Sequence, residues 1–112
     1  MIWEHYKNGK ISIKEFLFKL ETFRNNIEIT AHTFFRLSEK QRKIYTELIL
    51  KDFLLNKRPL EVWQQKNENL AVFYDYEKNK VLKIILRFSF DKIYIVTFYI
   101  LNKGQLEEFE YG

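Results

Sequence analysis

The sequence predicts an α+β fold in which two helices pack on one face of a four- or five-stranded antiparallel sheet. Apolar residues recur every three or four positions before residue 60 and every second position after it. Short turns at 67–69, 77–79 and 91–92 separate the candidate strands of the second half. Connections this short favour antiparallel neighbours, because parallel strands need long crossovers.

The first helix is predicted over residues 12–24. Ser12 and Glu15 have the spacing of a capping box. One stripe of this helix is apolar until it ends at Arg24, and its apolar members are Ile13, Phe16, Leu17 and Leu20. Residues 27–30 then alternate between apolar and polar side chains, which predicts a short strand.

A longer helix is predicted ahead of Pro59, a residue that cannot continue it. Residues 31–37 predict one or two helical turns, and Ser38 with Gln41 forms a second capping-box pair. The helix should run from there to about Lys57. The side chains expected to face inward are Ile44, Leu48, and either Phe53 or Leu54.

Four strands are predicted after Pro59, at 61–66, 70–76, 80–90 and 93–101. In the third, one parity is wholly apolar and should be buried under the helices; it consists of Leu82, Ile84, Leu86, Phe88 and Phe90. Lys83 and Arg87 have the other parity and should lie about 13–14 Å apart on the opposite face. The last strand is apolar on both parities, which predicts a central position, with Thr97 and Tyr99 on the same face as Ile93 and Ile95.

Composition predicts one globular domain of 112 residues with an anionic partner. The formal charge is +4 and the pI is near 9.2, so nucleic acid or an acidic protein would suit it. There is no Cys, which excludes disulfides and thiolate metal sites and fits a cytoplasmic protein. The longest apolar stretch has nine residues, too few for a helix to cross about 30 Å of membrane. No His/Glu spacing suits a metal, so no cofactor is expected.

Two groups of side chains are candidates for chemistry. His32 and Arg36 are four residues apart and would share one face of a helical turn. His32 would then be a general acid or base beside Arg36 as a phosphate-binding cation, or the two would be a surface pair without a role. The strand tyrosines could stack nucleic-acid bases or simply pack in the sheet; they are Tyr74, Tyr76, Tyr94 and Tyr99.

Three segments, in order, resemble the barnase/EndoU/colicin/RelE-like nuclease superfamily, especially its RelE/ParE-like toxins and phage-associated domains. Residues 27–36 resemble its opening strand with Thr-x-His and then Arg, 80–86 its strand with a basic residue, and 93–99 its final strand with Val-Thr-x-Tyr/Phe. The resemblance implies a RelE-like core at 27–101, preceded by an N-terminal helical extension (1–26) and followed by a tail (102–112). The acidic tail would be either an edge strand or a mobile end.

The resemblance implies a metal-independent ribonuclease, often the toxin of a toxin–antitoxin pair. His32 would act as acid or base, Arg36 and Lys83 would hold the phosphate, Thr97 would orient it, and Tyr99 would stack a base or donate a proton. Arg87 and Tyr74 would extend the RNA-binding track. Residues 1–24 have no counterpart in that fold, many RelE-type toxins lack this histidine, and ParE-like members target gyrase. A non-catalytic domain that binds nucleic acid or protein, and a structural protein without an active site, are the alternatives.

Overall fold

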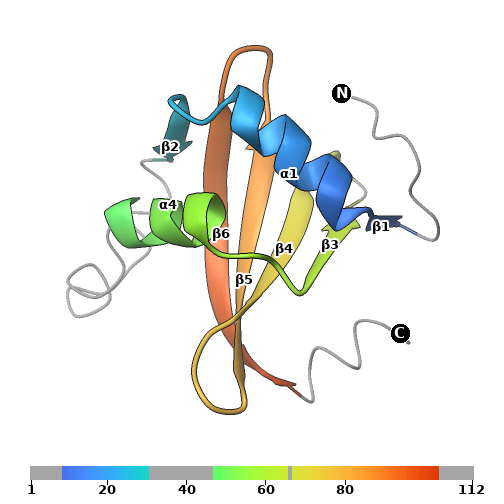
Figure 1. Cartoon of the computed structure of the whole chain (residues 1–112), viewed down its shortest axis with the longest axis vertical. Helices are drawn as coiled ribbons and strands as arrows, with labels where there is room; N and C mark the ends of the chain where they lie inside the picture. Colours follow the sequence, from blue (N-terminus) through green and yellow to red (C-terminus); the bar gives the residue numbers. More distant parts are fainter. Residues whose placement is uncertain (1–8, 31–46, 66, 104–112) are drawn as a thin grey trace.

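The computed structural model describes residues 9–30, 47–65 and 67–103, and Figure 1 draws the remaining residues in grey. The described elements are two helices and six strands: β1 (Lys10–Ile11), α1 (Ile13–Thr22), β2 (Ile27–Ile29), α4 (Glu47–Asn56), β3 (Glu61–Gln64), β4 (Leu70–Asp75), β5 (Lys80–Phe88) and β6 (Ile93–Asn102). The expected turns at 31–37, the helix start at Ser38 and most of the tail lie outside the described residues.

All six strands form one sheet in the order β1-β3-β4-β5-β6-β2. The pairing of β2 with β6 is parallel and the others are antiparallel. The expected sheet of four or five antiparallel strands is therefore wrong, both in strand number and in its uniform direction. The strand expected at 27–30 is present as β2, but it is an edge strand parallel to β6, and β1 at the other edge was not expected. These two strands have only three and two residues, too few for an alternating pattern to show a partner or a direction.

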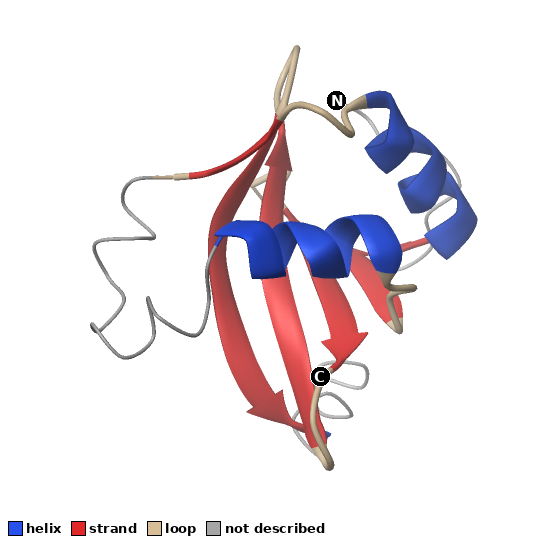
Figure 2. Ribbon diagram, turned by 60° about the vertical axis from the view of Figure 1, so that its left-hand side comes forward, coloured by secondary structure: helices blue, strands red, loops and turns tan. Residues whose placement is uncertain are grey.

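Both helices lie on the same side of the sheet, as Figures 1 and 2 show from two directions. The main hydrophobic core lies between this side of the sheet and the helices. Its buried residues include Phe16 and Leu20 of α1 and Leu50 and Leu54 of α4. The side of the sheet under the helices is called the helix face below. Because β1 pairs with β3 and α1 is buried in the core, residues 10–22 are an integral part of the fold.

Local signals explain where the helices begin and end. The Ser12 hydroxyl caps α1 by accepting a hydrogen bond from the Glu15 backbone N–H at 3.3 Å. Helix α4 ends at Asn56, just ahead of Pro59. Leu48 was expected to face inward but is 79% exposed, and Leu50 is buried instead. The reason is that apolar residues occur on several sides of α4, so periodicity alone could not select its buried side.

The alternation predicted for β5 is confirmed along the strand itself. Leu82, Ile84 and Leu86 are fully buried in the main core, and Phe88 packs against it with its ring 5.8 Å from that of Phe23. Phe90 is 99% exposed. It departs from the prediction because the strand stops at Phe88, and the backbone then turns through the hydrogen bond from Ser89 N–H to the Lys92 carbonyl.

A β-bulge in β6 changes which side chains share a face. Ile85 pairs with Thr97 while Leu86 pairs with Ile95, so one additional residue, Val96, is inserted into β6. Ile93 and Ile95 are buried in the helix-face core, but Thr97 and Tyr99 line a groove on the other side. The expectation that these four residues share one face is therefore wrong, because the bulge shifts the alternation by one residue.

Candidate nucleic-acid interface

The second face of the sheet carries cations above a small apolar floor. It is called the cation face here, and its floor is a cluster of buried side chains: Ala71, Phe73, Val81 and Ile85, with Trp63, Val96 and Leu101 packed against them. Lys83 and Arg87 have the same parity on β5 as Val81 and Ile85. Both helices of the described residues lie on the other side. The strand alternation thus separates an aliphatic face that binds the helices from a face with cationic side chains.

A groove of about 440 Å³ lies on the cation face. Lys83 and Tyr99 are paired residues of neighbouring strands, and Thr97 is paired with Ile85, the next residue of the same face. The groove therefore brings together three residues that the resemblance selected: Lys83, Thr97 and Tyr99. The remaining lining residues are Gln65, Asn69, Ile85, Val96 and Leu101. A volume of this size is within the usual range for small-ligand sites.

Lys83, which lines this groove, lies between two aromatic rings. Its Nζ atom is 5.7 Å from the centre of the Phe73 ring and 5.8 Å from that of Tyr99, which is the range of cation–π contacts. Burial lowers the pKa of Lys83, because the charged form loses part of its hydration. An anion bound in the groove would stabilise the charged form of Lys83, which has already lost part of its hydration.

A second aromatic–cation pair lies further along the same two strands. Arg87 is paired with Tyr94, and its guanidinium carbon is 5.5 Å from the centre of that ring. Lys83 and Arg87 are four residues apart on β5, which corresponds to about 13 Å at the rise of a strand. The cation face therefore carries two similar pairs, Lys83 with Tyr99 and Arg87 with Tyr94, about 13 Å apart along β5.

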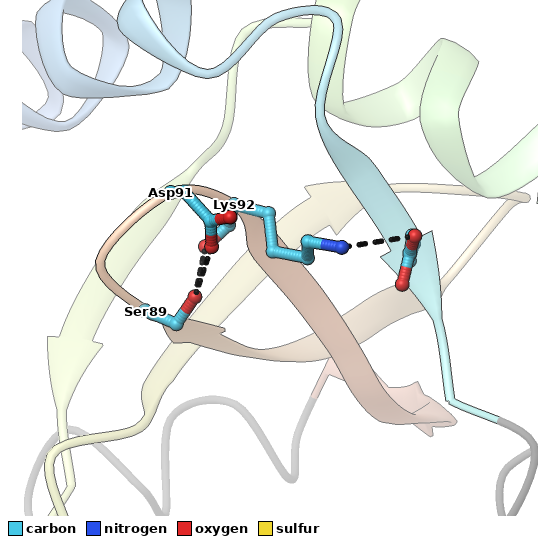
Figure 3. Close-up of polar contacts among 4 residues, drawn as sticks. Ser89, Asp91 and Lys92 are labelled. Atoms are coloured by element: carbon cyan, nitrogen blue, oxygen red, sulfur yellow. Dashed lines mark hydrogen bonds and ion pairs between the residues drawn. The ribbon is translucent and has the colours of Figure 1, made fainter.

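Lys92 is close to the second pair but is held by another group. Its Nζ atom is 5.9 Å from the centre of the Tyr94 ring, and it also forms an ion pair with Glu28 of β2 at 3.2 Å. The hydrogen bond and the charge of Glu28 raise the pKa of Lys92. Figure 3 shows Lys92 extending toward β2 from the β5–β6 turn, where the Ser89 hydroxyl donates to Asp91. Of the two cations beside Tyr94, Lys92 is therefore already paired with a carboxylate.

The structure does not bring every predicted residue to this face. Tyr74 was expected on the RNA-binding track, but it is 1% exposed and belongs to the helix-face core, where its ring packs against Phe53 at 5.7 Å. That prediction is wrong, because Tyr74 has the parity of β4 that points toward the helices. His32 and Arg36 lie outside the described residues. Sequence reasoning also missed the pairing of Arg87 with Tyr94, which depends on the bulge; without it Arg87 would be opposite Ile95.

The comparisons with known proteins give one match. The model of the MJ0788 family matches residues 14–86, well over half of the chain. The chain belongs to this family. The matched segment of the MJ0788 family contains Lys83 but stops before β6, which supplies Thr97 and Tyr99. No curated protein and no solved structure gives a significant match. The family description carries no activity and does not connect the chain with the barnase/EndoU/colicin/RelE-like superfamily.

Two further properties bear on the kind of site. Among residues 9–30, 47–65 and 67–103, no group of three or more His, Cys, Asp or Glu side chains is placed to hold a metal ion. Neither helix in the described part of the chain is long and apolar enough to cross a membrane. Besides Lys83, Arg87, Thr97 and the tyrosines, the cation face carries the amides of Gln65 and Asn69 in the groove and the carboxylate of Glu61, which is paired with Lys10.

Proposed function

We propose that the cation face binds single-stranded RNA. The observation that carries the proposal is the repeated pairing of a cation with an exposed or half-buried tyrosine, at Lys83–Tyr99 and Arg87–Tyr94. Proteins that bind single strands combine aromatic rings, on which bases stack, with cations that contact the phosphates. A sheet surface suits this task because its side chains stand outward at regular intervals.

A metal-independent ribonuclease is the more specific form of the proposal. It is favoured by the presence of Lys83, Thr97 and Tyr99 in one groove. Cleavage through the 2′-OH needs an acid–base pair and donors that stabilise the charged phosphorane. Lys83 would supply the charge and Thr97 a hydroxyl that orients the phosphate, while Tyr99 would stack a base or donate a proton. His32 would be the acid or base, with Arg36 on the phosphate.

The ribonuclease proposal also implies a partner and a compartment. An RNA-cleaving toxin needs an inhibitor, and an acidic antitoxin would suit a chain of formal charge +4. Such a pair would act in the cytoplasm, where the RNA is. A non-catalytic domain that only binds RNA, or one that binds a protein instead, would use the same surface without cleavage, so binding and cleavage are tested separately.

Binding is tested by fluorescence anisotropy with a short labelled single-stranded RNA. Lys83→Gln and Tyr94→Leu should each weaken binding about tenfold, because each removes a phosphate or stacking contact of roughly 1–3 kcal/mol. Lys14→Gln is the control, since Lys14 is an exposed cation on α1. Equal affinity for all four proteins would show that RNA does not bind on the cation face.

Cleavage is tested with the same RNA in the presence of EDTA. Wild type, His32→Ala and His5→Ala are compared, and His32→Ala should cleave roughly 10²–10⁴ times more slowly, the usual contribution of one general acid or base. The DNA of the same sequence should bind without being cut, because it lacks the 2′-OH. If wild type binds RNA through Lys83 but cuts none of the RNAs offered, the protein is a binding domain.

A further inference from the structure

A second pocket lies on the helix face, on the other side of the sheet from the Lys83 groove. Its volume is about 330 Å³, and it is formed where the chain leaves α4 and where β4 ends. Figure 1 shows the segment that follows α4 crossing the front of the sheet toward β3. The lining residues are Phe53, Lys57, Arg58, Tyr74, Asp75 and Tyr76, and the name Tyr74 pocket is used for this site.

The hydroxyl of Tyr74 is the first unusual feature of this pocket. It is buried and has no hydrogen-bond partner within the described part of the chain. Burial raises the pKa of Tyr74 far above its ordinary value, so the group keeps its proton and remains a donor. A buried polar group without a partner costs free energy and needs an explanation. A molecule that enters the pocket and accepts this hydrogen bond would supply one.

The charges around the pocket favour an anion. Lys57 and Arg58 are adjacent exposed cations that follow the last turn of α4. The carboxylate of Asp75 is already neutralised by Lys103, whose Nζ atom is 3.2 Å away. The rim therefore offers two cationic side chains, one of them a guanidinium that can bind a phosphate through two parallel hydrogen bonds.

Aromatic rings complete the wall. Phe53 and Tyr76 are half-buried, and their ring centres are 6.0 Å apart. The ring of Phe53 also packs against that of Tyr74. The aromatic wall of the pocket is therefore continuous with the main core. Helix C-terminal carbonyls attract cations, so Lys57 and Arg58 could serve α4 alone. That role explains neither the aromatic wall nor the buried hydroxyl of Tyr74.

We propose that the Tyr74 pocket binds a mononucleotide, that is, a phosphate monoester of a sugar that carries a planar base. Lys57 and Arg58 hold the phosphate, Phe53 and Tyr76 contact the ring, and the Tyr74 hydroxyl donates a hydrogen bond to an acceptor of the ligand. This site is separate from the RNA-binding surface, because Tyr74 and Lys83 lie on opposite faces of the sheet.

The test is isothermal titration calorimetry of the full chain with AMP, adenosine and inorganic phosphate. AMP should bind at least about tenfold more tightly than either of its parts, because only AMP uses both the cations and the rings. Arg58→Gln should weaken AMP binding at least about tenfold, and Tyr74→Phe roughly three- to tenfold, the range for hydrogen bonds to charged and neutral groups. Lys14→Gln is the control for lost charge.

Tyr74→Phe also separates a ligand-binding hydroxyl from a structural one. The variant should raise the melting temperature of the unliganded protein, because it removes a buried hydroxyl without a partner, and yet bind AMP more weakly. Binding of AMP no tighter than phosphate, or AMP affinities of Tyr74→Phe and Arg58→Gln equal to wild type, would overturn the proposal. Lys83→Gln should leave AMP binding unchanged, so RNA binding and nucleotide binding can fail independently.

Discussion

The two faces of the sheet are built from the same strands but use different chemistry. On the helix face, β5 contributes Leu82, Ile84 and Leu86, all fully buried against the helices. On the cation face, the same strand contributes Lys83 and Arg87, each near an aromatic ring. One face is buried against the helices, and the other carries cationic and aromatic side chains above a smaller apolar cluster. A strand that alternates strictly can serve both, because a change on one face leaves the other nearly untouched.

The bulge in β6 is what aligns the cation face. It places Thr97 and Tyr99 beside Lys83 and, on its other side, sets Tyr94 opposite Arg87. Bulges are common next to functional sites, where they redirect side chains. In this sheet the additional residue, Val96, also packs against the floor of the cation face. The bulge thus determines which side chains of β6 lie beside Lys83 and Arg87 in the candidate site.

The largest expected difference between the faces is in folding stability. Leu86→Ala should lower the free energy of unfolding by about 2–5 kcal/mol, because it leaves a cavity in a fully packed core. Tyr99→Leu, on the cation face, should change it by less than about 1 kcal/mol, because Tyr99 is 45% exposed. Urea denaturation followed by circular dichroism measures both. Similar losses in the two variants would mean that the cation face is also part of the stabilising core.

Local signals of the sequence were sufficient for much of this fold. The capping serine of α1, the end of α4 before Pro59 and the alternation of β5 each depend on residues close together in the chain. The alternation at 27–30 predicted β2 as a strand, but neither its pairing nor the existence of β1 was predictable in the same way. β2 pairs with β6, which follows more than sixty residues later, and β1 is two residues long. Such pairing depends on the whole sheet and leaves no local pattern.

The candidate site was predictable only in part, for the same reason. Ordered motifs selected Lys83, Thr97 and Tyr99, which the structure places in one groove. A separate argument, that strand tyrosines could stack bases, assigned Tyr74 to the RNA-binding track, although its parity on β4 buries it on the helix face. Alternation cannot tell which of two apolar parities faces the helices when both are apolar, as in β4 and β6. A bulge has no signature in such a segment either.

The next largest effect concerns RNA binding to the cation face. Three neutralised phosphates, at Arg36, Lys83 and Arg87, predict a slope of about −2 for log affinity against log salt concentration, from roughly −0.7 per phosphate. Arg87→Gln should make the slope shallower by about 0.7. Anisotropy titrations between low and physiological salt measure it, with Lys14→Gln as the matched control. Affinity that does not respond to salt would exclude a phosphate track on this face.

A smaller effect is expected in the titration of Lys83. Burial lowers its pKa from the ordinary 10.5, so the folded state releases this proton more readily than the unfolded state. The cost of the buried charge is fully present below the folded pKa and is relieved as pH rises through it toward 10.5. Bound phosphate favours the charged form and should raise the pKa. NMR titration of the lysine Nζ resonances, with and without RNA, measures the shift. No change on RNA binding would place the phosphate away from Lys83.

The smallest effect is expected at the ion pair between Glu28 of β2 and Lys92 of the β5–β6 turn. Glu28 raises the pKa of Lys92 above 10.5, so the pair stabilises the fold fully below that pH, and the gain is lost as pH rises through the folded pKa. Glu28→Gln should return the Lys92 pKa toward 10.5 and lower the melting temperature only slightly, because both groups are near the surface and well screened. RNA affinity should stay the same or rise slightly, since Lys92 would become available beside Tyr94. NMR titration measures the Lys92 pKa, and fluorescence anisotropy measures the RNA affinity. A large loss of RNA binding in Glu28→Gln would show that the Glu28–Lys92 pair, rather than Arg87, is needed for binding at this end of the cation face.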